Sequence, residues 1–242
     1  MHPTWPFYLR AVLALHIAMG AVAFVCAPVA LATAKGGRTH RRWGKIYFWA
    51  MAGVAATALF LSIVLPILFL ALVAVFSFYA AFSGYRVLYL KNLTRGGKAH
   101  FADWFAAGIT FVSSCALAVI GAFWPRLVPG LGVVAIVFGF LGMGLASASI
   151  RTFLRPPVEE QFWWFFHMRG MIASYIAACT AFSSVNLGHW FGDALWVWLW
   201  PTAIGIPLSI WWQRSYRAKF AARAMVDPGV SGGCSMMLPY IS

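Results

Sequence analysis

The chain has 242 residues, of which 62% are hydrophobic and only 10% are charged. A soluble domain has about 45–50% apolar and about 25% charged residues, so this composition excludes a disordered chain and argues against a soluble globular enzyme. Lys and Arg total 18 against five acidic residues, for a formal net charge of +13. The composition predicts an all-α, polytopic membrane protein, in which the positions of the positive charges report topology.

Clusters of charge, Gly and Pro divide the chain into apolar segments. A helix needs about 20 apolar residues to cross the hydrocarbon core. The stretch 46–90 is too long for one crossing, so a turn at Pro66 must split it. The expected spans are residues 8–33, 44–65, 66–90, 104–124, 129–150, 162–186 and 194–213. We therefore expect one bundle of about seven transmembrane helices over 1–213, followed by a basic and then flexible tail over 214–242.

The first apolar run, residues 11–34, is longer than the about 7–15 residues of a signal-peptide core, so we expect a retained span. Sixteen of the 18 positive charges fall at one membrane face, and only Arg10 and Arg126 fall at the other. The positive-inside rule then predicts an N-terminus outside and a cytoplasmic C-terminus, as expected for a bacterial inner-membrane protein. The basic charge therefore indicates topology and contact with anionic lipid head groups, not nucleic acid.

The sequence lacks the motifs that several kinds of metal binding and catalysis require. The four cysteines form no CxxC pair, which argues against a cysteine-type zinc site, and GxSxG, HExxH and P-loop motifs are absent. Asp103, Glu159 and Glu160 are expected at the inner membrane edge and Asp193 at the outer edge. Because no acid falls deep in a span, a proton relay built on carboxylates is disfavoured, and no metal site is predicted.

The histidines are the main candidates for chemistry. His40, His100 and His167 each fall at or just inside the cytoplasmic start of an even-numbered span, so three helices can bring them to one membrane face. Imidazole is the usual protein ligand of haem and of many metal ions, and it can also donate a hydrogen bond to a quinone head. The pattern allows a haem b or quinone site. The alternative is that these histidines meet lipid phosphates or backbone carbonyls.

A second set of polar residues lies within the spans. His16 is expected inside the first span, where an imidazole must find a partner, such as His189 or a backbone carbonyl. The sixth span carries hydrogen-bonding groups at Ser174, Tyr175, Thr180 and Asn186. Hydrogen bonds between helices explain these groups without a ligand, but they could also line a substrate cavity.

Four stretches of the sequence resemble parts of a known protein family. They read KGGRTHRRWGKIYFWAM at 35–51, FSFYAAFSGYR at 76–86, HMRGMIASYIAACTAFSSVN at 167–186 and WPTAIGIP at 200–207. Together they resemble an uncharacterised bacterial multi-pass membrane family, the domain of unknown function 2306 and its close relatives. The resemblance implies the fold and no assigned reaction. Its signature positions are His40, Arg41, Gly44, Tyr47, His167, Tyr175, Thr180 and Asn186. At His100 this chain reads HFADW where some relatives have a longer basic motif, which weakens a ligand role for His100.

Three functions stay open on the sequence. The first is a redox-associated membrane protein that binds haem b or a quinone near the cytoplasmic-side histidines. The second is a carrier or channel for a small solute, which needs a polar cavity at mid-depth. The third is a non-catalytic partner subunit, either in a complex with another membrane protein or as a homo-oligomer.

Overall fold

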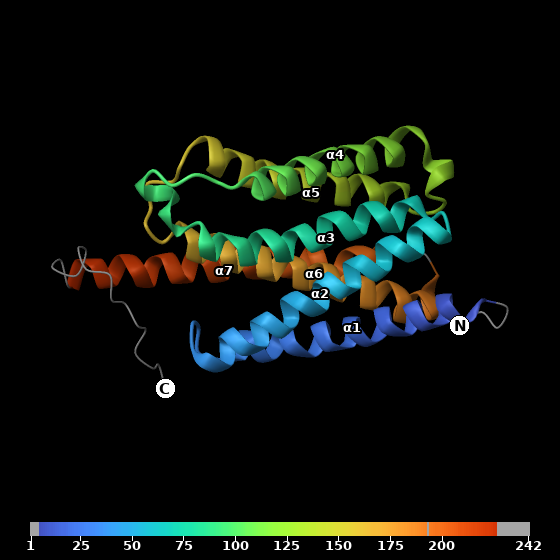
Figure 1. Cartoon of the computed structure of the whole chain (residues 1–242), viewed down its shortest axis with the longest axis horizontal. Helices are drawn as coiled ribbons and strands as arrows, with labels where there is room; N and C mark the ends of the chain where they lie inside the picture. The colour runs from blue at the N-terminus through green and yellow to red at the C-terminus, as the bar shows by residue number, and fades with distance from the viewer. Residues whose placement is uncertain (1–4, 193, 227–242) are drawn as a thin grey trace.

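The computed structural model describes residues 5–192 and 194–226, and these residues form helices and turns without a strand (Figure 1). In hydrocarbon each backbone N–H and C=O group must find a partner within the protein, and a helix satisfies most of them within its own segment. The long helices are α1 Phe7–Ala32, α2 Arg38–Val64, α3 Leu68–Arg86, α4 Phe101–Phe123, α5 Gly132–Leu154, α6 Phe162–Phe191 and α7 Leu195–Val226. Short 3₁₀ turns lie at η1 Val87–Tyr89, η2 Lys91–Arg95 and η3 Pro125–Leu127.

Within the described part of the chain, six helices, α1 to α6, are long and apolar enough to cross a membrane. The protein is therefore a multi-pass membrane protein. Helix α7 is longer still, but it is less apolar, because its first half contains Pro201, Pro207 and several tryptophans and its second half is basic.

The helices form two outer hairpins, and the packed pair α3 and α6 lies between them (Figure 1). Helices α1 and α2 form one hairpin, and α4 and α5 form the other. Helix α3 lies between them and packs on α2, α4, α5 and α6. Helix α7 packs along α6 and also touches α5. The starts of α2, α4 and α6 consequently lie at the same end of the bundle, as the sequence predicts.

Several helix ends differ from the predicted ones where charged residues occur. Helix α2 begins at Arg38, six residues before the predicted start at 44, and α7 continues past the predicted end at 213. Arg and Lys have high helix propensity, so a basic segment next to an apolar span can extend the helix into the head-group layer. By contrast, residues 87–95 form 3₁₀ turns instead of the end of a span. The predicted turn at Pro66 is confirmed, and residues 227–242 of the predicted tail lie outside the described residues.

A pair of glycines sets the contact between α3 and α6. A Cβ atom added to Gly170 would lie 2.7 Å from the Cα of Gly84, and one added to Gly84 would lie 2.9 Å from the backbone nitrogen of Met171. Both distances are too short for carbon, so only glycine allows the two backbones to approach this closely. Gly144 of α5 is the contrast, because a Cβ added there would meet no atom within 4 Å. Small residues allow close helix packing in lipid, where a hydrophobic driving force between helices is lacking.

We expect Gly170→Ala to lower the free energy of unfolding by about 1–3 kcal/mol, because the added methyl group must push α3 and α6 apart. The matched control, Gly144→Ala, should leave stability unchanged or raise it by up to about 1 kcal/mol, since alanine favours helix more than glycine does. Thermal unfolding in mild detergent, followed by circular dichroism, measures both. Equal stability of the two variants would contradict the assigned α3–α6 contact.

Candidate functional site

The structure brings together two of the three predicted inner-face histidines. His40 is in the first turn of α2, and His167 is in the second turn of α6. Their ring centroids lie 6.2 Å apart, with the ring planes at 76°. These residues are 127 positions apart in the chain, and α3 lies between their helices in sequence and contacts both. The pair is thus a product of tertiary packing.

Each imidazole of this pair is held by the end of a different helix. His40 Nδ1 donates to the Ala30 carbonyl at 2.9 Å, and His167 Nδ1 donates to the Gly84 carbonyl at 2.7 Å. Both carbonyls lie in the last turns of α1 and α3, where a helix leaves its C=O groups without intrahelical partners.

These bonds also fix the tautomer of each ring. A carbonyl can only accept, so Nδ1 must carry the proton, and in a neutral ring Nε2 then keeps its lone pair. Neither Nε2 atom has a hydrogen-bond partner among residues 5–192 and 194–226. The pair therefore offers two free nitrogen ligands, each held in orientation by a second bond.

Two lysines interact electrostatically with the histidine pair. Lys35 donates to the Leu31 and Thr33 carbonyls at the end of α1, and its Nζ lies 5.4 Å from the Trp212 ring centroid. Partial burial lowers the pKa of the Lys35 ammonium. Lys91 Nζ lies 4.0 Å from the Trp163 ring centroid. Lys35 acts electrostatically on His40, and Lys91 acts on His167. This end of the bundle therefore attracts negative charge.

The other two predicted histidines lie elsewhere. His100 is exposed at the N-cap of α4, where its backbone carbonyl accepts from the Asp103 backbone N–H at 2.9 Å and its backbone N–H donates to the Asp103 carboxylate. It makes no ring contact with His40 or His167. His16 is half-buried on α1, and its Nδ1 lies 2.9 Å from the hydroxyl of Thr57 on α2. Its partner is therefore Thr57, not the suggested His189, which is exposed near the end of α6.

The four polar residues predicted on α6 occupy different environments. Ser174 is fully buried and accepts a 2.5 Å hydrogen bond from the hydroxyl of Tyr47 while donating to the Met171 carbonyl. Tyr175 is partly buried against Phe24. The remaining two differ further: Thr180 is buried with no partner for its hydroxyl among the described residues, and Asn186 is exposed and bonds the Phe182 carbonyl. Of these four residues, only Ser174 forms a side-chain hydrogen bond to another helix, as the explanation without a ligand requires.

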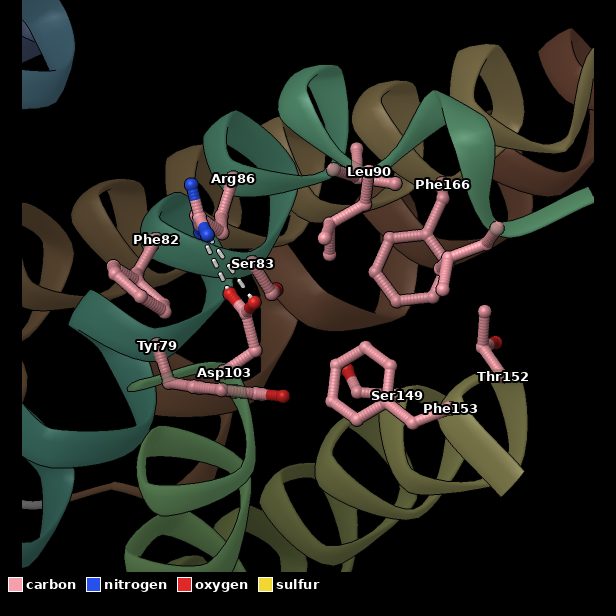
Figure 2. Close-up of a pocket in the computed structure, with 12 residues that line it drawn as sticks. Tyr79, Phe82, Ser83, Arg86, Leu90, Asp103, Ser149, Thr152, Phe153 and Phe166 are labelled. Atoms are coloured by element: carbon pink, nitrogen blue, oxygen red, sulfur yellow. Dashed lines mark hydrogen bonds and ion pairs between the residues drawn. The ribbon is translucent and has the colours of Figure 1, made fainter. Parts of the chain in front are cut away.

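Sequence reasoning missed a buried ion pair at the same end of the bundle. Figure 2 shows Asp103 of α4 pointing toward Arg86 at the end of α3. Arg86 Nε donates to Asp103 Oδ1 at 2.8 Å, and the His100 backbone N–H donates to Oδ2 at 2.8 Å. The Asp103 side chain is only 1% exposed, against 32% for Arg86. The signal was present as an acid in the first turn of an apolar helix in a chain with only five acids.

The ion pair borders a small cavity of about 20 Å³ that is also lined by Tyr79, Ser149 and Thr152 (Figure 2). This volume is enough for one water molecule but not for an organic ligand. The cavity therefore does not form a substrate site. The chain matches no protein-family model, no curated protein and no solved structure.

We expect Asp103→Asn to lower the free energy of unfolding by about 1–3 kcal/mol, because Arg86 loses its charge partner and a charge-assisted bond is weakened. The matched control is Glu160→Gln, which removes the exposed partner of Arg95, 3.8 Å away. Exposed ion pairs contribute little to stability, so Glu160→Gln should change the free energy of unfolding by no more than about 0.5 kcal/mol. Thermal unfolding in detergent checks both, and a tolerated Asp103→Asn would show that the pair is not structural.

Proposed function

We propose that this protein is a membrane electron-transfer protein that binds haem b through His40 and His167. The observation that carries the proposal is the pair of free Nε2 atoms on two imidazoles whose Nδ1–H groups are already bonded to the Ala30 and Gly84 carbonyls. Ligand histidines commonly have this second-shell bond, because it sets the tautomer and increases the basicity of the ligating nitrogen. A haem group bound there would supply reversible one-electron chemistry.

The separation of the rings supports the same proposal. His40 and His167 would hold the iron of the haem group together, which requires that their rings lie close to each other. The centroids of the two rings lie 6.2 Å apart. A quinone head bonded at both carbonyls would need a wider pair, because its own ring would lie between two hydrogen bonds. This comparison favours haem over quinone.

The positive charge near the histidine pair also supports haem binding. Haem b carries two propionate carboxylates, and Lys35 and Lys91 act electrostatically on His40 and His167, respectively. Both ammonium groups are near the membrane interface and belong to segments between spans, where the side chains can reach a carboxylate.

An optical spectrum of the purified protein, produced with ample haem, tests the proposal. We expect a Soret band that sharpens and shifts on reduction by dithionite, with about one haem per chain. His40→Ala and His167→Ala should each remove most of the bound haem, because each variant lacks one of the two side chains that would hold the group. The matched controls His100→Ala and His189→Ala should keep the wild-type spectrum, since both residues are exposed and lie outside the pair. A spectrum without a Soret band in folded wild-type protein would reject the proposal.

We further propose a bacterial inner-membrane location, with α7 as a seventh crossing, the N-terminus outside and the C-terminus cytoplasmic. Helix α7 runs along α6 through the depth of the bundle (Figure 1), and most positive charges lie at the end that holds His40 and His167. Such a bias sets orientation in short loops.

Reporter fusions in a bacterial host test this topology. Green fluorescent protein at the C-terminus should fluoresce, and alkaline phosphatase at the same position should be inactive, because that end would stay in the cytoplasm. Alkaline phosphatase fused after Phe123, in the turn between α4 and α5, should be active. The reverse pattern would overturn the orientation, and an active C-terminal phosphatase alone would remove the seventh crossing.

A further inference from the structure

We propose that the first two turns of α2 form a specific binding site for the head group of an anionic phospholipid. Arg38, Arg41, Arg42 and Lys45 line an open hollow on the surface of this helix. Their spacing of three and four residues places them on one face of the helix. All four side chains are exposed, so their charged groups are available to a ligand. Neither His40 nor His167 lines this hollow, so the proposal does not depend on haem binding.

The four cations have no counter-charge within the described residues. Asp103, Glu159 and Glu160 pair with Arg86, Arg217 and Arg95, respectively. Like charges three and four residues apart on a helix repel each other. They also lie at the positive end of the helix dipole, which adds to the repulsion. An anion in the hollow would relieve both effects.

The surrounding surface identifies that anion as a lipid. Ile46 and Trp49 follow the cations on α2, and they are 38% and 70% exposed. Trp49 lies four residues after Lys45, so the two share a face. The 27 residues of α2 extend about 40 Å, more than the about 30 Å of the hydrocarbon core, which leaves the basic turns at the level of the head groups. A phosphate in the hollow would therefore continue into acyl chains along Ile46 and Trp49, an arrangement that a soluble anion does not need.

Native mass spectrometry of the full chain in detergent, with equal amounts of phosphatidylglycerol and phosphatidylcholine, tests the site. We expect wild-type protein to retain phosphatidylglycerol preferentially. The variant Arg38→Gln/Arg41→Gln/Arg42→Gln/Lys45→Gln should reduce that adduct at least about tenfold, because each cation near an anionic lipid surface contributes measurably. The matched control, Lys98→Gln/Arg151→Gln/Arg155→Gln/Arg214→Gln, removes the same charge from exposed positions outside the hollow and should change the adduct less than about twofold.

Equal losses in the two variants, or none in either, would overturn the proposal, because binding would then follow net charge or another surface. Displacement of the lipid by millimolar inorganic phosphate would also overturn it, in favour of a soluble anion. If the fourfold variant does not fold, Arg41→Gln/Arg42→Gln provides the same comparison against Arg151→Gln/Arg155→Gln. His167→Ala, on α6, should leave the lipid adduct unchanged, so failure of the haem proposal and failure of this one are distinguishable.

Discussion

The close contact between Gly84 and Gly170 determines the arrangement of the candidate site. It brings the backbones of α3 and α6 together at a distance that no Cβ atom permits. His167 lies three residues before Gly170 on the same helix face, so the same approach brings its imidazole within 2.7 Å of the Gly84 carbonyl. The helix contact and the orientation of a candidate ligand are thus one structural unit, and widening the contact would also release the histidine.

Polar side chains in this bundle satisfy helix ends. His40 and Lys35 bond carbonyls of α1, His167 bonds a carbonyl of α3, and Asp103 accepts from the backbone at the start of α4. An unpaired backbone carbonyl or N–H group near hydrocarbon is costly, which gives each of these residues a structural role. For the two histidines that role uses only Nδ1, so it leaves Nε2 free. A structural and a ligand function are therefore compatible in the same side chain.

The charges at this end of the bundle follow two different patterns. The three described acids are all paired with arginines. The four cations on the first turns of α2 are unpaired within the described residues and share one exposed face. An excess of cations at one end is common in membrane proteins. It does not account for their convergence on one hollow above an exposed tryptophan, which is the feature that the lipid proposal explains.

The sequence by itself determined the fold class, the helix-rich membrane character and the turn at Pro66, because length and hydropathy are local properties of each segment. It also placed His40, His100 and His167 at one end of the bundle. Only the tertiary structure decided that His40 and His167 meet while His100 caps α4, that His16 bonds Thr57, and that Asp103 is buried against Arg86. Helical spacing gives the face on which a side chain lies, but the partner that faces it depends on how the helices pack.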